Sequence, residues 1–385
     1  MRTLNFVVFL TAFFSIYGLL NAYIFLHGWN AIPGGSALRS AYAVVFWVAA
    51  FSFIAGRVLE RFWLSPLSDT LVWIGAFWFG AMIYFFLIAL GLDVLRSINH
   101  FYSFFPRFIS ANYAQAKYIG AAASIGVVGL LLIGGHINAL IPRVTPVALQ
   151  IHKKTEGPKS LNIVAASDIH LGTIIGRHRF DHIVEKINSL HPDVVLLCGD
   201  IVDEDVGPVI KENLGEALRN IQSKFGVYGI TGNHEFIGGV EPASVYLRAH
   251  GVNLLRDQAV KVNNSFYLAG REDRSFNRRG QRRRKSLAEL LQNVDPTFPV
   301  VVMDHQPFGL KEAIQAGVDL QLSGHTHHGQ LWPVNYLIRS MFEVGWGHRQ
   351  IGQTHFYVSN GVGTWGPPVR IGNRPEIVNL QISFE

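Results

Sequence analysis

The sequence predicts an all-α transmembrane domain followed by a soluble α/β domain. Only ten of the sixty charged residues lie in residues 1–141. The same stretch holds four apolar runs, each close to the roughly 20 residues that cross a bilayer. The rest of the chain alternates short apolar runs with helix-length amphipathic segments, as α/β domains do. We expect the transmembrane domain at 1–141, a juxtamembrane linker at 142–160 and the α/β domain at 161–385.

The four apolar runs cover about Leu4–Leu26, Leu38–Gly56, Leu71–Leu92 and Tyr118–Ile141. A signal peptide is a poorer explanation of the first run, because that run is too long and lacks a clear small-residue cleavage site. Tryptophans prefer the headgroup region of a bilayer, and four of them lie within or near the ends of these runs: Trp47, Trp63, Trp73 and Trp78. The sequence therefore predicts an integral membrane protein with four spans.

Four spans would place both ends of the chain on the same side of the membrane. Seven basic residues near the spans lie on that side and four on the other. Because basic residues favour the cytoplasmic side, this bias favours a cytoplasmic α/β domain, in the inner or plasma membrane of a bacterium. Loss of the second span would reverse the bias. Cys198 is the only cysteine, so the chain forms no internal disulfide.

The second half begins with a polar, proline-bearing stretch, 142–160, in which Pro146–His152 is a candidate strand. A helix is expected at Arg177–Leu190, whose apolar residues recur at helical spacing, and another at Phe308–Gly317. Apolar runs predict strands at Leu161–Ser167, Asp193–Gly199, Phe225–Ile230, Ser265–Gly270, Pro299–Asp304, Val318–Gly324, His355–Asn360 and Glu376–Phe384.

Residues that commonly bind metals follow five of these strands directly. In α/β folds the loops after the carboxyl ends of the strands form the site. The residues are Asp168, His170, Asp200, Asn233, His234, His305, His325 and His327. Burying so many carboxylates and imidazoles without a cation would cost several kcal/mol for each unpaired charge.

The ligand types indicate which metals would bind. Oxygen and nitrogen ligands without a thiolate suit Mn²⁺, Fe or Zn²⁺, and we expect Mn²⁺. The number of ligands exceeds what one ion needs. The sequence therefore predicts a dinuclear site with two divalent cations.

These motifs resemble those of the calcineurin-like metallophosphoesterases, and in particular of their transmembrane branch. The family pattern is matched in order by "DIH", "GDIVD", "GNHE", His305 and "GHTH". The resemblance covers about residues 161–385 and implies two packed β-sheets flanked by helices.

The resemblance also implies a role for each residue of the motifs. Asp168, His170 and His327 would bind the first metal. The second would be bound by Asn233, His305 and His325, with Asp200 shared by both metals. His234 would be a catalytic residue that assists the leaving group.

The chemistry of phosphoester hydrolysis fits this residue set. Two cations about 4 Å apart can hold a bridging hydroxide near neutral pH, which attacks phosphorus in line. His234 can supply a proton to the leaving oxygen. Asn233 is a neutral ligand, so the site keeps enough positive charge to bind a phosphoanion.

Five residues are expected to contact the substrate. The predicted loop at Arg271–Lys285 contains eight basic residues and two acidic ones. It could clamp a phosphate, contact anionic lipids or remain solvated. The loop lacks interleaved aromatic residues beyond Phe276, which disfavours a nucleic-acid partner. Near the end of the chain, "YVSNGVGTWGPPVRIGNRPEI" resembles the C-terminal signature of membrane-associated family members. The expected contacts are Arg271, Asp273, Arg274, His328 and Arg370.

The last histidine of "GHTHH", His328, departs from the family pattern, which has glycine there. If the run is extended, His325 and His327 turn towards different metals and His328 lies on the opposite side of the strand. His328 would then line the substrate pocket, support a ligand or face solvent.

The sequence thus predicts a membrane-bound phosphoesterase that cleaves a phosphoester or pyrophosphate bond, with membrane lipids as partners and a lipid-linked substrate. One sub-branch of the family cleaves UDP-2,3-diacylglucosamine, which makes a substrate of that kind one candidate, although no local motif indicates uridine binding. Two alternatives remain open: a tethered phosphodiesterase or phosphatase for soluble nucleotides or phosphoproteins, and a non-catalytic membrane scaffold or sensor.

Overall fold

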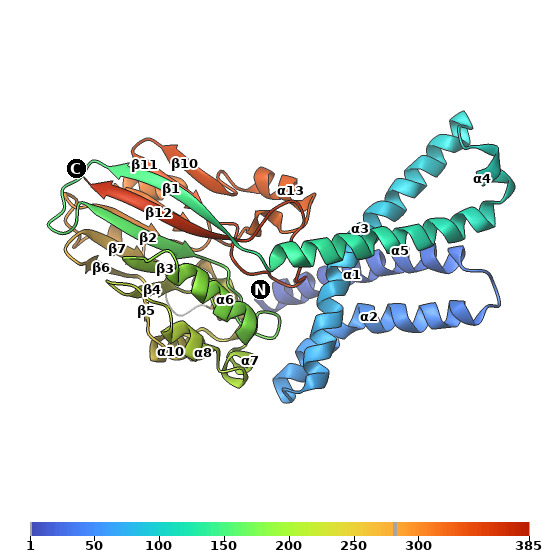
Figure 1. Ribbon diagram of the computed structural model, residues 1–385, viewed down its shortest axis with the longest axis horizontal. Helices are drawn as coiled ribbons and strands as arrows, with labels where there is room; N and C mark the ends of the chain where they lie inside the picture. Colours follow the sequence, from blue (N-terminus) through green and yellow to red (C-terminus); the bar gives the residue numbers. More distant parts are fainter. Residues whose placement is uncertain (1, 280–282, 385) are drawn as a thin grey trace. The chain divides into compact units, whose positions relative to one another are not determined.

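The computed structural model describes residues 2–279 and 283–384, which divide into two compact units. The first is all-helical and extends to Gly135, together with Gly366–Pro368. The second comprises His136–Trp365 and the residues from Val369 onward, and contains both sheets. Figure 1 shows the helical unit and the α/β unit of the chain. The predicted order, an all-α region followed by an α/β domain, is confirmed.

The first unit contains four helices that are long and apolar enough to cross a membrane. The third extends beyond its predicted run at both ends. It starts at a capping box in which the Ser65 side chain accepts from the Ser68 amide, with Pro66 at the first helical position. The helices of this region are α1 (Arg2–Ala31), α2 (Ala37–Phe62), α3 (Pro66–Tyr102), the short α4 (Arg107–Ala111) and α5 (Tyr113–Ala139).

The second unit is built on two six-stranded sheets. The first sheet has the order β1 (Arg143–Ile151), β12 (Glu376–Phe384), β2 (Ser160–Ala166), β3 (Val194–Cys198), β4 (Val227–Ile230) and β5 (Val252–Leu254). The second has the order β10 (Gly347–Ile351), β11 (Thr354–Val358), β9 (Leu320–Ser323), β8 (Val300–Met303), β7 (Phe266–Gly270) and β6 (Gln258–Val262).

The main core of this unit lies between the two sheets. Leu196 and Leu380 of the first sheet share one buried cluster with Phe266 and Val301 of the second. Each of these four side chains is fully buried. The sheets therefore pack face to face, as expected. Because the core fixes both sheets, it also fixes the loops at their ends.

Helices and short turns complete the unit. Helix α6 buries Phe180, Ile183, Val184 and Ile187, the apolar face that predicted it. These elements are α6 (Arg177–Asn188), α7 (Val206–Lys211), α8 (Leu214–Arg219), α9 (Asn233–Gly238), α10 (Val240–Ala249), η1 (Arg274–Arg279), α11 (Leu287–Leu290), α12 (Leu310–Gln315), η2 (His327–Gly329) and α13 (Val334–Met341).

The segment predicted as a linker is largely a strand. Residues Arg143–Ile151 form β1, which pairs in parallel with β12 over its whole length. Leu149 and Ile151 enter the core between the sheets. Helix α5 ends at Ala139, so only three residues separate it from the sheet. The strand proposed at Pro146–His152 thus exists and begins earlier than expected, and the connection is much shorter.

Candidate metal centre

The predicted ligands lie on loops at the carboxyl ends of parallel strands from both sheets. In the first sheet β2, β3 and β4 are parallel, and in the second β7, β8, β9 and β11 are parallel. Asp168, Asp200, His305 and His325 each come two residues after a strand. The fold therefore brings together residues that lie up to 159 positions apart in the sequence.

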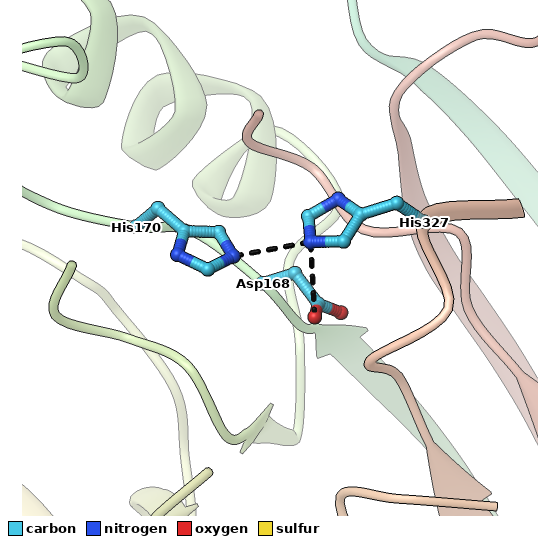
Figure 2. A group of neighbouring side chains, drawn as sticks. All are labelled: Asp168, His170 and His327. Carbon is cyan, nitrogen blue, oxygen red and sulfur yellow. Dashed lines mark hydrogen bonds and ion pairs between the residues drawn. The ribbon is translucent and has the colours of Figure 1, made fainter. Parts of the chain in front are cut away.

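One cluster consists of Asp168, His170 and His327, shown in Figure 2. The Nε2 atoms of the two histidines lie 3.1 Å apart, and His327 Nε2 is 3.5 Å from Asp168 Oδ1. Burial, helped by the neighbouring charges of His170 and Arg370, holds the pKa of His327 well below its ordinary value. A neutral imidazole is the form that binds a metal. These donors fit one divalent cation.

A second cluster consists of Asp200, His305 and His325. Asp200 Oδ2 lies 3.0 Å from His305 Nε2 and 4.0 Å from His170 Nε2 of the first cluster, so this carboxylate reaches both. Burial opposes its ionisation, but the facing His305, His234 and His170 outweigh burial and hold the pKa of Asp200 well below normal. An ionised carboxylate between the clusters suits a ligand shared by two cations.

Asn233 supports the cation interpretation independently. Its Oδ1 atom is buried and accepts no hydrogen bond from any residue that the structure describes. Its neighbour His234 donates its backbone amide to Asp200 Oδ1 at 2.9 Å, which ties this part of the chain to the second cluster. Leaving a buried acceptor unpaired costs about 1–3 kcal/mol. A cation would satisfy the Asn233 oxygen.

The backbone is strained at the predicted ligands. Asp168, His170, Asp200, His325 and His327 all have positive φ angles, between 46° and 70°. Side-chain-bearing residues rarely adopt this conformation, and it costs on the order of 1–3 kcal/mol each. His328 also has a positive φ angle, whereas Thr326 is right-handed, so the run from His325 to His328 is a turn and the expectation of an extended run is wrong. The turn, rather than the alternation of a strand, aims the two ligands.

Two motif glycines leave room for the carboxylates. A Cβ atom at Gly232 would collide with Asp200 Oδ1, and one at Gly324 would collide with Asp168 Oδ2. The small residues in "GNHE" and "GHTH" therefore have a steric cause. Any larger residue would displace a predicted ligand.

Two acidic residues of the site received no role from the sequence. Asp203 Oδ1 lies 3.4 Å from His170 Nδ1 and 3.3 Å from His234 Nδ1. Glu235 is buried and accepts from the amides of Val202 and Gly232. Both belong to the quoted motifs, as the last residues of "GDIVD" and "GNHE". Carboxylates of this kind orient metal-binding histidines.

Asp203 also affects the protonation of His234. Burial alone would lower the pKa of His234, but the negative charges of Asp200 and Asp203 outweigh it and raise the pKa to about 9. The two carboxylates therefore favour the protonated form of the His234 ring. It can donate a proton to a leaving oxygen.

We expect Asp203→Asn to lower kcat by about 10–100-fold, because outer partners of metal-binding histidines typically contribute that much. The ¹⁵N chemical shifts of His170 and His234 should move as well, since both rings lose a charged partner. Asp205→Asn is the matched control, because Asp205 only caps α7. Unchanged histidine shifts in Asp203→Asn would contradict this positioning role.

Arg370 lies beside the first cluster rather than open to substrate. Its side chain is 1% exposed and donates to the carbonyl oxygens of Gly361 and Gly363. One guanidinium nitrogen lies 3.3 Å from His327 Nδ1. The Arg370 guanidinium is bonded internally here, and its contact with the substrate stays a prediction. Arg370 holds the C-terminal loop against a predicted metal ligand.

Two further predicted substrate contacts are held in internal bonds. Arg271 is buried and forms 3.0 Å ion pairs with Asp304 and Glu312. Asp273 is buried and accepts from Gln306 Nε2. These contacts give both side chains a structural role. Contact of Arg271 and Asp273 with the substrate stays a prediction.

Arg274 and His328 are also engaged. Arg274 donates to the Phe308 carbonyl at 2.8 Å. The buried His328 ring stacks on Trp346 at 4.7 Å between centroids. Of the three roles left open for His328, support of the metal-binding turn fits this packing.

Three further basic side chains of the loop also make internal contacts. Arg284 pairs with Asp304, and Arg283 pairs with Glu289. Lys285 donates to the Asp257 carbonyl. Residues 280–282 of this loop lie outside the described residues. Five of the eight basic side chains of the loop therefore make internal contacts, and a phosphate clamp stays a prediction.

Two clusters that could each hold a cation, at the strand ends of two packed sheets, fit a dimetal phosphoesterase. A family model described as calcineurin-like phosphoesterase matches residues 161–329. A metallophosphoesterase of Aquifex aeolicus, described as uncharacterized, is 33% identical over 249 residues, covering 64% of this chain and 94% of that protein. The chain belongs to the calcineurin-like metallophosphoesterase family, whose members depend on two metals.

Two relatives also contain transmembrane regions. Proteins described as "transmembrane protein with metallophosphoesterase domain" are 34% identical in Bos taurus and 30% identical in Danio rerio. The first match covers 67% of this chain and 61% of the bovine protein. The second covers 83% and 74%. Together with the four apolar helices, these relatives show that the chain is an integral membrane protein.

Proposed function

We propose that this protein hydrolyses a phosphoester or pyrophosphate bond of a lipid-linked substrate at the membrane surface. The observation that carries the proposal is the presence, in one chain, of a complete dimetal ligand set and four membrane-spanning helices. A catalytic domain for soluble phosphoesters needs no membrane. UDP-2,3-diacylglucosamine represents the pyrophosphate substrates of this class.

In the proposed reaction each residue of the site has a separate role. Asp168, His170 and His327 would hold one cation, and Asn233, His305 and His325 the other, with Asp200 between them. When bound, two divalent cations, which we propose to be Mn²⁺, polarise phosphoryl oxygens and lower the pKa of water. His234 donates the proton that the leaving oxygen needs. Asp203 keeps the His234 ring in place through its 3.3 Å contact.

An exposed apolar surface next to the metal centre supports a membrane-bound substrate. We define the α13 surface as Trp332, Tyr336, Leu337, Met341 and Trp365, which are between 49% and 60% exposed. Helix α13 buries none of its residues. The ring of Trp365 lies 5.6 Å from that of His234. Exposed tryptophan, tyrosine and leucine side chains of this kind favour the interface of a bilayer.

The last turn of α5 supports the same proposal. Asn138 donates to the carbonyl oxygens of Arg370 and Asn373 at 2.8 and 2.7 Å. Within the same loop the Ile371 carbonyl accepts from the Trp332 amide at 2.7 Å. These bonds fix the last turn of α5 to the C-terminal loop within the α/β unit. The catalytic unit thus continues directly from the sequence of a membrane helix, which supports a substrate presented at a membrane.

The proposal is tested with the purified full chain and Mn²⁺. The substrates are a soluble aryl phosphodiester and UDP-2,3-diacylglucosamine presented in vesicles. We expect hydrolysis of both, with kcat/KM at least about tenfold higher for the lipid, and lipid profiling of membrane extracts should identify the natural substrate. Hydrolysis of soluble nucleotides or phosphoproteins alone would show a tethered phosphoesterase. No hydrolysis at all would favour a scaffold.

We expect the double substitution Leu337→Ser and Met341→Ser to lower kcat/KM on vesicle-presented substrate about tenfold. Burying the two side chains in the interface should contribute on the order of 1.5–3 kcal/mol, and 1.4 kcal/mol corresponds to tenfold. The soluble aryl phosphodiester should be hydrolysed at the unchanged rate. Val245→Ser is the control, since Val245 is also exposed but lies on α10. Equal losses on both substrates would contradict a membrane role for α13.

We further propose that the catalytic unit is cytoplasmic and that the protein is in the inner or plasma membrane of a bacterium. The excess of basic residues on the side of the chain ends supports this orientation. Protease added outside sealed, right-side-out vesicles should leave the loop at 271–285 intact. Cleavage there would contradict the orientation.

A further inference from the structure

The first unit contains a cavity that the phosphoesterase activity does not use. Its volume is about 560 Å³, and residues of α1, α2, α3 and α5 line it. Its walls are mostly apolar and aromatic, and they include Phe46, Trp78, Phe85, Ile88, Ala121 and Ile125. The volume falls within the ~300–1,000 Å³ typical of ligand pockets. An apolar cavity among membrane helices is suited to an acyl chain.

The lining becomes polar towards one end of these helices. His27, Asn30, Arg96 and Lys117 also line the cavity. They come from the C-terminal parts of α1 and α3 and the N-terminal part of α5, which lie at the same end of this unit (Figure 1). Lys117 Nζ donates to the Asn30 carbonyl at 3.0 Å, which joins α5 to α1 at this end. The cavity therefore has an apolar interior and a polar mouth.

The mouth carries positive charge in excess. Its nearby carboxylate, Asp93, accepts from Tyr23 Oη at 2.6 Å, from His27 Nε2 at 3.0 Å and from Arg96 Nη1 at 3.0 Å. Asp93 is thus already committed to three partners. Among the residues that the structure describes, Lys117 has no acidic partner. Ionised residues in membrane helices usually pair with a partner or mark a binding site.

We propose that this cavity binds one anionic phospholipid, with an acyl chain along the apolar wall and the phosphate at Lys117 and Arg96. The apolar interior matches the chain, and the excess cations match the headgroup. No residue that lines the cavity belongs to the metal centre, since all of them lie in the first unit. Lipid binding in the cavity can therefore be tested independently of the hydrolytic reaction.

The headgroup is tested by native mass spectrometry of the delipidated full chain, titrated with dioleoylphosphatidylglycerol or dioleoylphosphatidylcholine. One added cation contributes about 1 kcal/mol to the binding free energy of an anionic lipid. This corresponds to an affinity about fivefold higher. We expect a single phosphatidylglycerol to bind at least fivefold more tightly than phosphatidylcholine. Lys117→Gln should remove this preference. Arg107→Gln should keep it, since Arg107 is exposed at the same end but does not line the cavity.

The cavity itself is tested with two glycines of α5. A Cβ atom at Gly120 or at Gly126 would meet nothing within 4 Å, but only Gly120 lines the cavity. We expect Gly120→Phe to weaken lipid binding at least tenfold and Gly126→Phe to leave it unchanged. Ala121→Trp, which fills the cavity from a neighbouring position, should repeat the loss if Gly120→Phe fails to fold. Thermal unfolding and hydrolysis of the soluble phosphodiester monitor folding.

Either of two results would overturn the proposal. Equal affinity of the wild-type chain for the two lipids would show that the cavity does not prefer an anionic headgroup. Undiminished binding in both cavity-filling variants would place the lipid elsewhere. Neither result would affect the proposed phosphoesterase, whose test is hydrolysis.

Discussion

Asp200→Ala is expected to lose metal and to lower kcat/KM by about a thousandfold or more. The Asp200 carboxylate faces His305 and His170, one from each cluster, so its loss weakens both cation sites. Metal ions contribute several kcal/mol to transition-state stabilisation, and about 4 kcal/mol corresponds to a thousandfold. The measurements are metal content by elemental analysis and hydrolysis of an aryl phosphodiester.

The control for this variant is Asp295→Ala, which removes an exposed aspartate that caps a turn on the same unit. It should retain metal and rate. The circular dichroism spectrum of Asp200→Ala should remain that of a folded α/β protein. Wild-type turnover in Asp200→Ala would refute the dimetal mechanism.

His234→Ala is expected to keep both metals and to lower kcat by about 10²–10⁴-fold, the usual contribution of a positioned acid or base. The loss should depend on the leaving group. An alkyl phosphodiester needs a proton on its leaving oxygen and should suffer most, whereas a nitrophenyl ester needs little help. Rates on both substrates, together with metal content, check the prediction.

His182→Ala is the matched control, because His182 is an exposed histidine on α6. Its rates should equal those of the wild type on both substrates. Equal losses on the alkyl and aryl esters in His234→Ala would show that His234 positions the substrate and does not donate a proton.

The sequence was sufficient for the architecture because its signals are local. Apolar runs of bilayer length mark α1, α2, α3 and α5, and short buried runs mark the strands whose ends carry the ligands. Strand β1 was harder to delimit, because it lies within a proline-bearing, partly basic segment and most of its residues are not buried. Its pairing with β12 connects residues 233 positions apart, and no local pattern records such a partner.

The ligand set was predictable for a related reason. A carboxylate or imidazole directly after a buried strand has few roles other than metal binding or catalysis. The role of an arginine is harder to predict, because its side chain can face solvent, bind the substrate or pair with an acidic residue inside the protein. Arg271 and Arg370 look like phosphate contacts in the sequence, but Asp304 and the Gly361–Gly363 carbonyls occupy them. Only the folded chain shows these partners.

The turn at His325–His328 illustrates a further limit. Its positive φ angles occur beside the stacking of His328 on Trp346 and the space left by Gly324. Neither contact can be read from the motif. The motif identified the candidate ligands, whereas the directions of their side chains required the structure.

The hydrogen bonds at the end of α5 determine where the chain can be cut. Besides the Asn138 contacts, Arg179 donates to the Ala139 carbonyl at 2.9 Å, so this last helical turn belongs to the α/β unit. A truncation at the predicted boundary of residue 161 would remove both β1 and Asn138 and expose one edge of the first sheet. A water-soluble catalytic fragment should therefore begin at or before His136. Fragments that begin later are expected to aggregate even with every predicted metal ligand present.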